Sequence, residues 1–173
     1  MTAKDLNLRF VIEALPSLQD YLLSNELYWP LSGTLPRLTP GSLLLTLAFL
    51  SITEPVEAEK YHGQVDLVRS RWRTAWDKKI SREFSNRMRL WSQYVSDQIK
   101  HPEQNMESFK VQVRGRVILQ LLMDDFTDIA LINELSNWDD LVKQKFIPGK
   151  FLWDSNFEIL FPVEVYWFLY GSL

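Results

Sequence analysis

The chain has 173 residues, of which 46% are hydrophobic and 24% charged, with a net charge of −3. This composition is typical of a globular protein with one sizeable core and excludes a disordered or fibrous chain, so we expect a single domain over residues 1–173. The absence of cysteine excludes disulfides, thiolate zinc sites and cysteine nucleophiles, and it fits a reducing compartment. Because no apolar segment follows a basic N-terminal start, we expect no signal peptide and a cytoplasmic location.

The first helical pattern lies between Asp5 and Ser24, where apolar residues recur every three or four positions on both sides of Pro16. This predicts one kinked helix or two short stacked helices. Residues 25–39 combine glycine and prolines with several large apolar side chains. We therefore expect a loop that lies packed on the core.

A strongly apolar segment follows from Leu43 to Ile52. Thr39 and Pro40 are a favourable N-cap and first-turn pair for a helix here. Since this helix would have no polar face, we expect it to be surrounded by protein. It is shorter than the roughly 20 residues that a membrane span requires, so we expect no membrane-spanning helix.

The longest uninterrupted pattern runs from Val56 to Lys100, with Gly63 as its one glycine and no internal proline. It begins after Pro55 and is followed by Pro102, both of which favour a helix between them. The pattern predicts one helix of about 45 residues, which would be about 68 Å long.

Large apolar residues form a stripe along this segment with a mean spacing of 3.8 residues. A left-handed coiled coil would require about 3.5. We therefore favour a stripe that is buried within the chain, with Trp72 and Trp76 in the core, over the alternative of a stripe that is partly shared with a partner. Its members are Tyr61, Val65, Val68, Trp72, Trp76, Ile80, Phe84, Met88, Trp91, Val95 and Ile99.

Residues 109–119 fit two structures. They alternate like a β-hairpin with Gly115 at its tip, but a stripe with helical spacing runs through the same residues from Met106 to Leu121. We favour a helix, in which Gly115 would mark a close crossing against another helix. Farther along, residues 128–146 predict two short helices, and the aromatic-rich segment 151–173 should pack on the long helix.

Charge is the most unusual feature of the sequence. Eight basic residues lie between positions 69 and 89 against two acidic ones, so this segment carries +6 and the rest of the chain −9. Such a segment suits an acidic protein surface or the phosphates of nucleic acid. We call these residues the basic segment and treat them as a candidate interaction face: Arg69, Arg71, Arg73, Lys78, Lys79, Arg82, Arg87 and Arg89.

Two acidic clusters are candidates for metal chemistry. Asp124, Asp125 and Asp128 have the DDxxD spacing that places carboxylates one helical turn apart, and these five positions resemble the aspartate-rich box of isoprenoid synthases. No second acidic box follows, and the chain is too short for the cavity of those enzymes. Residues 54–59 hold three glutamates near a helix start, where acidic residues also complement the helix dipole.

These patterns predict an all-α protein, an irregular helical bundle organised on one long helix, which needs no cofactor. No nucleophile elbow, phosphate-binding glycine loop or paired-histidine zinc motif is present in the sequence. The leading hypothesis is a non-enzymatic adaptor or structural domain that binds a protein partner or associates with itself. The alternatives are a phosphate-directed nucleic-acid binder and, third, a small metal-dependent hydrolase that uses the acidic clusters.

Overall fold

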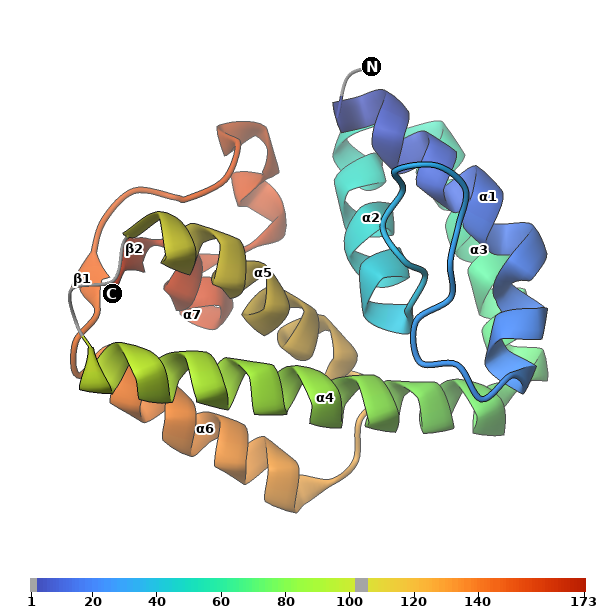
Figure 1. Cartoon of the computed structure of the whole chain (residues 1–173). Coiled ribbons are helices and arrows are strands. Elements are labelled where there is room, and N and C mark those ends of the chain that lie inside the picture. Colours follow the sequence, from blue (N-terminus) through green and yellow to red (C-terminus); the bar gives the residue numbers. More distant parts are fainter. Residues whose placement is uncertain (1–2, 102–105) are drawn as a thin grey trace. The chain divides into compact units, whose positions relative to one another are not determined.

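The computed structural model describes residues 3–101 and 106–173, and the described chain is mostly helical (Figure 1). It divides into two compact units, Met1–Glu83 and Phe84–Leu173. Helix α4 (Arg73–Lys100) contributes residues to both. The expectation of one domain stays a prediction, which calorimetry would test by showing one unfolding transition or two.

In the first unit, α1 (Ala3–Leu23), α2 (Pro40–Thr53) and α3 (Pro55–Arg71) pack on one another (Figure 1). Pro16 lies inside α1, so the first of the two predicted alternatives, one helix, is the one that forms. Phe10, Val11 and Leu18 are buried on its inner face. Val11 and Leu18 belong to the apolar pattern with three- and four-residue spacing that identified the helix in the sequence.

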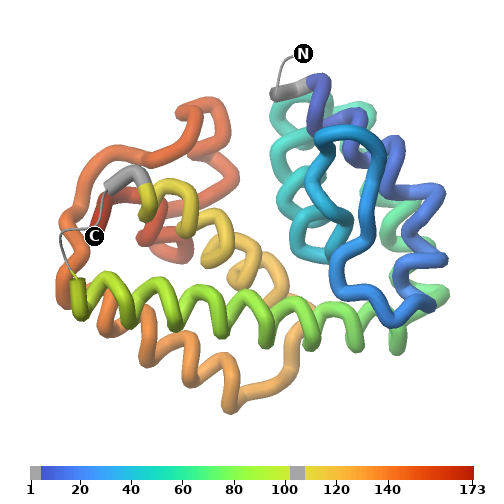
Figure 2. The backbone as a smooth tube through the Cα atoms, in the orientation of Figure 1, coloured from blue at the N-terminus to red at the C-terminus, as the bar shows by residue number. Residues whose placement is uncertain are grey.

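Helix α2 begins as the sequence predicts. Thr39 is its N-cap and accepts a hydrogen bond from the Ser42 amide, while the Ser42 hydroxyl accepts one from the Thr39 amide. Pro40 occupies the first helical position, and most of the helix is buried. The loop before it covers one side of the three helices (Figure 2). Within that loop Leu35 and Leu38 are buried, which confirms that it packs on the core.

The single helix of about 45 residues is wrong, because the chain breaks at Trp72 between α3 and α4, and the longest helix has 28 residues. Trp72 adopts φ −115° and ψ 38°, and the chain turns sharply there (Figure 1). Neither glycine nor proline marks the break. Helix α3 packs on α1 and α2, while Lys79 and Glu83 at the start of α4 bond to the segments that flank the loop between α1 and α2.

Most of the stripe is buried within the two units, as predicted. Trp76 is 0% exposed, whereas Trp72, at the break, is only half-buried, so its predicted place in the core is wrong. The other half-buried members are Val68 and Ile99. Because the chain turns at Trp72, this residue does not lie in line with the buried residues of the stripe.

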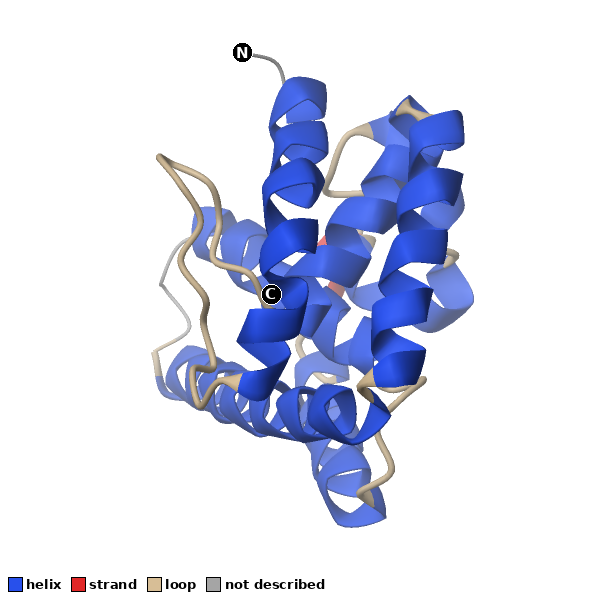
Figure 3. Cartoon of the chain, turned by 90° about the vertical axis from the view of Figure 1, so that its right-hand side faces the viewer, coloured by secondary structure: helices blue, strands red, loops and turns tan. Residues whose placement is uncertain are grey.

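The second unit contains the C-terminal part of α4, then α5 (Met106–Leu122) and α6 (Ile129–Lys143), followed by a tail of short elements. The tail comprises β1 (Ile147–Pro148), η1 (Ser155–Leu160), α7 (Val163–Tyr166), η2 (Trp167–Leu169) and β2 (Gly171–Ser172). The two strands pair antiparallel, with Ile147 opposite Ser172, and are the small red elements of Figure 3. Met106 opens α5, but its side chain lies outside what the structure describes, as does Pro102.

Helix α5 settles residues 109–119 as helix, in agreement with the favoured prediction. Gly115 is not a close crossing point, however, because a Cβ added there would meet nothing within 4 Å. Residues 129–143 form one helix rather than two. Asp139 of α6 forms a buried ion pair with Arg116 of α5 at 2.6 Å. Arg116 also lies over the ring of Phe168, 4.4 Å from its centroid, so it links α5, α6 and the tail.

No helix in the described part of the chain is both long and apolar enough to cross a membrane.

Candidate interaction site

Two members of the basic segment hold the end of α1. The Lys79 ammonium donates to the carbonyl oxygens of Ser24, at 3.1 Å, and Glu26, and Arg82 donates to that of Asn25 at 2.8 Å. A helix end leaves carbonyl oxygens without partners, and cations complement its dipole. Lys79 is 2% exposed, and desolvation, followed by the positive charge of Arg82, lowers its pKa. Lys79 therefore has a structural position and contributes no exposed surface.

The three arginines around the break also contact residues of α3, of α4 or of the break itself. Arg69 lies over Trp76 and pairs with Asp66 at 3.9 Å. Arg71 lies over the ring of Trp72, and Arg73 pairs with Asp77 at 2.9 Å. These pairs are at least partly exposed, so each contributes little to stability, but they leave fewer cations available for an external anion.

The remaining members, Lys78, Arg87 and Arg89, lie on α4. Lys78 and Arg89 are exposed, and Arg89 donates to Asn86 Oδ1 at 3.3 Å. Arg87 is half-buried and belongs to the second unit. The basic segment therefore comprises residues that bond to the chain just after α1, locally paired residues, and Lys78, Arg87 and Arg89, of which Lys78 and Arg89 are exposed.

The DDxxD residues do not lie on one helix, because α5 ends at Leu122 and a turn follows. Asp128 instead caps α6, where its carboxylate accepts from the amides of Ala130 and Leu131. Among the described residues, no group of three or more histidine, cysteine, aspartate or glutamate side chains is arranged to hold a metal ion.

A groove in the second unit brings together residues that the sequence did not single out as a set. It lies between α4 and α5, has a volume of about 200 Å³, and we call it the α4–α5 groove. Leu90 is 45% exposed and Val111 70% exposed, so apolar surface faces water there. Its lining residues are Arg87, Leu90, Trp91, Val111, Gln112, Arg114 and Gly115.

Arg114, together with Arg87, gives the groove its positive charge. Its side chain is exposed, yet the groove walls still desolvate the guanidinium. This desolvation first, and the positive charge of Arg87 second, lower the pKa of Arg114. No hydrogen bond or ion pair of its guanidinium is found in the described parts of the chain. Two arginines that repel each other beside exposed apolar side chains are suited to an anion that also carries an apolar group.

Sequence reasoning found Arg87 but missed Arg114, Leu90 and Val111. The signal was present in part, since Leu90 and Val111 are large apolar residues that fall off the buried stripes of their helices. Which of them face each other depends on how α4 and α5 pack, and this is a tertiary property that spacing along one helix does not contain.

No protein-family model, curated protein or solved structure matches this chain. Its fold and its groove define it as a mostly helical protein with an amphipathic, basic groove.

Proposed function

We propose that this protein is an interaction domain that binds a short acidic segment of a partner protein in the α4–α5 groove. The observation that carries this proposal is the combination, in one open groove, of exposed Leu90 and Val111 with Arg114 and Arg87. Exposed apolar surface beside charge is typical of an interaction site. The proposal makes the adaptor hypothesis specific, because it names the binding surface, which is the α4–α5 groove, and the partner, which is a short acidic segment.

The side chains that line the groove determine which kind of peptide it can bind. Guanidinium groups bind carboxylates in bidentate geometry, so acidic residues of the partner suit Arg87 and Arg114. One apolar side chain between them would cover Leu90 and Val111, and burying it would contribute about 1.5 to 3 kcal/mol. After the cost of ordering the peptide, we expect a dissociation constant on the order of 10⁻⁵ M.

Nucleic acid is the weaker alternative for two reasons. Several cations of the basic segment already bond within the chain, among them Lys79, Arg82 and Arg73. The remaining exposed cations would neutralise only a few phosphates, which supports non-specific binding of about 10⁻⁴ M at physiological salt. The negative charge of the rest of the chain also repels a polyanion.

The test is a fluorescence-polarisation titration of the whole protein with a labelled peptide that has leucine between two pairs of glutamates. Its matched control peptide has glutamine in place of every glutamate. We expect the acidic peptide to bind at least tenfold more tightly, and Arg114→Glu to abolish that preference. Lys110→Glu is the matched control variant, because Lys110 is exposed on α5 but does not line the groove.

A second variant tests where the peptide binds and leaves the charge of the protein unchanged. Gly115 lines the groove with open space where its side chain would be, so Gly115→Phe should fill the groove while the helix is retained. We expect this variant to weaken the acidic peptide at least tenfold and to keep the parent far-ultraviolet circular dichroism. Equal binding of both peptides, or tight binding of random-sequence nucleic acid that Arg114→Glu abolishes, would contradict the proposal.

A further inference from the structure

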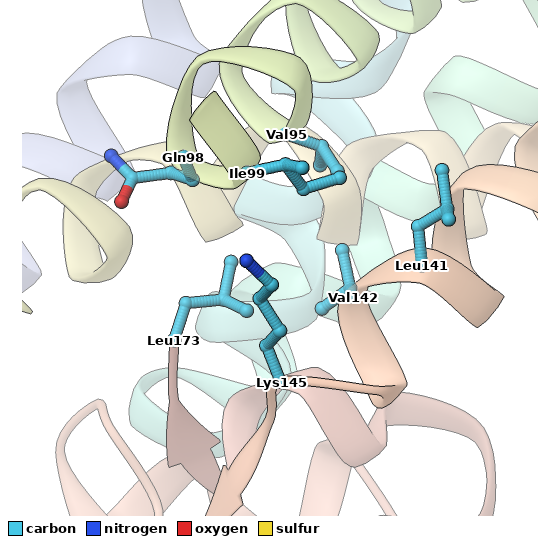
Figure 4. Close-up of a pocket in the computed structure, with 7 residues that line it drawn as sticks. All are labelled: Val95, Gln98, Ile99, Leu141, Val142, Lys145 and Leu173. Atoms are coloured by element: carbon cyan, nitrogen blue, oxygen red, sulfur yellow. The ribbon is translucent and has the colours of Figure 1, made fainter. Parts of the chain in front are cut away.

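A second hollow of the same unit has a different character. It is enclosed by the C-terminal end of α4, the C-terminal end of α6 and the last residue, Leu173, and has a volume of about 160 Å³ (Figure 4). Most of its lining is aliphatic. Its lining residues are Val95, Gln98, Ile99, Leu141, Val142, Lys145 and Leu173.

Lys145 is the one cation in this lining. Its side chain extends between Leu173 and Val142, and its amine points toward the α4 side of the pocket (Figure 4). No hydrogen bond or ion pair of this ammonium occurs within the described ranges of the chain. The neighbouring Lys143 differs, because it pairs with Asp140 at 3.2 Å and lies over the ring of Trp167.

We propose that this pocket binds a small carboxylate with a compact apolar tail, whose anionic head pairs with Lys145. An apolar cavity of about 150 Å³ holds a benzene molecule, so the volume here suits a six-carbon ring or a short branched chain. The tail would contact Val95, Ile99 and Leu141, and the carboxylate would approach the Lys145 ammonium. A longer polar ligand does not fit the volume, and a cationic ligand would be repelled.

The binding strength follows from the size of the ligand. So few atoms support a dissociation constant of about 10⁻⁴ to 10⁻³ M. Each additional methylene that the pocket accepts should tighten binding about fourfold, and the gain should stop once the pocket is full. A partly exposed ion pair should add about a fivefold preference for the carboxylate over a neutral ligand of the same shape.

The test is a titration of the isotope-labelled full chain by NMR with three ligands that share a phenyl ring and differ in the charge of the attached group: benzoate, benzyl alcohol and benzylamine. We expect shifts at Val95, Leu141 and Leu173, with benzoate binding most tightly and benzylamine least. Lys145→Gln should remove the preference for benzoate over the alcohol while binding of the alcohol persists. Lys110→Gln, an exposed lysine of α5 outside this pocket, should keep it.

Leu141→Trp, which should fill the pocket, provides a second variant and should weaken all three ligands. The inference would be overturned by equal affinities for benzoate and benzylamine, by shifts that lie elsewhere, or by a benzoate preference that survives Lys145→Gln. These outcomes are independent of the α4–α5 groove, because the two sites share no lining residue.

Discussion

Glu83 of α4 accepts hydrogen bonds from the Thr39 hydroxyl at 2.6 Å and, two residues farther on, from the Gly41 amide at 2.8 Å. The carboxylate is 0% exposed, so it supplies a buried negative charge to the N-terminus of α2, where the helix dipole and the unpaired amides favour one. This relationship joins residues 44 positions apart and fixes the start of α4 on α2.

Replacing Glu83 should therefore be costly. Glu83→Ala leaves the Thr39 hydroxyl and the Gly41 amide buried without this acceptor, and we expect a loss of about 2 to 4 kcal/mol in the free energy of unfolding. Chemical denaturation measures this loss. The matched control is Glu59→Ala on α3, an exposed acid that should cost less than about 1 kcal/mol. Equal midpoints for the two variants would contradict the capping role.

The two tryptophans of the stripe should differ sharply. Trp76 is fully buried, and Trp76→Ala should cost about 3 to 5 kcal/mol through the cavity that it leaves. Trp72 is half-buried at the break, so Trp72→Ala should cost about half as much or less. Denaturant unfolding of the two variants checks this order, and a larger loss for Trp72 would mean that the break is not where the structure places it.

These examples show how far the sequence determines the fold. Spacing of apolar residues identified α1, α5 and most of the buried stripe, while the Thr39–Pro40 pair before an apolar run identified α2, because these are local properties of the sequence. It did not reveal the break at Trp72, where the sequence has neither glycine nor proline and the apolar spacing continues. Nor did it reveal that Asp139 pairs with Arg116, a partner on another helix.

The candidate sites could be predicted from the sequence only in part. The charge of residues 69–89 was evident, but the capping positions of Lys79 and Arg82 depend on where α1 ends in space. The groove depends on Arg114 and Leu90, which lie on different helices. Residues on one helix can be placed on a face from spacing alone, whereas the pairing of two faces requires the packed structure.

Gly171 should tolerate no side chain. A Cβ there would meet the Ile147 carbonyl oxygen and would lie 2.6 Å from the ring of Phe146, so the strand pair would have to separate. We expect Gly171→Ala to cost about 1 to 3 kcal/mol. Gly63 of α3 is the control, since nothing lies near its missing side chain and Gly63→Ala should stabilise by about 0.5 to 1 kcal/mol. Thermal melts of both variants would show opposite shifts, and shifts of the same sign would contradict this packing.

The second unit should lose stability in alkali. Burial first, and the negative charge of Asp124 second, raise the pKa of Tyr166 above its ordinary value of 10.0. The folded protein thus holds this proton more strongly than the unfolded chain. The associated stability is complete below about pH 10 and is lost as the pH rises through the folded pKa.

Tyr166→Phe keeps the ring and removes this titration, so its stability should fall less steeply above about pH 10 than that of the parent. Urea denaturation at a series of alkaline pH values measures both slopes. Burial raises the pKa of Tyr94 and Tyr170 as well, so part of the slope should remain in the variant. An unchanged slope would show that Tyr166 does not contribute.

The most direct measurement of the central proposal is a charge exchange across the α4–α5 groove. The parent protein and the double variant Arg87→Glu with Arg114→Glu are each titrated with the acidic peptide and with its twin in which lysine replaces every glutamate. The account predicts that the parent prefers the acidic peptide at least tenfold and that the double variant prefers the basic twin, with Arg89→Glu behaving as the parent because Arg89 does not line the groove. An unchanged preference in the double variant, at parent levels of helical circular dichroism, would place the acidic partner elsewhere and contradict the account.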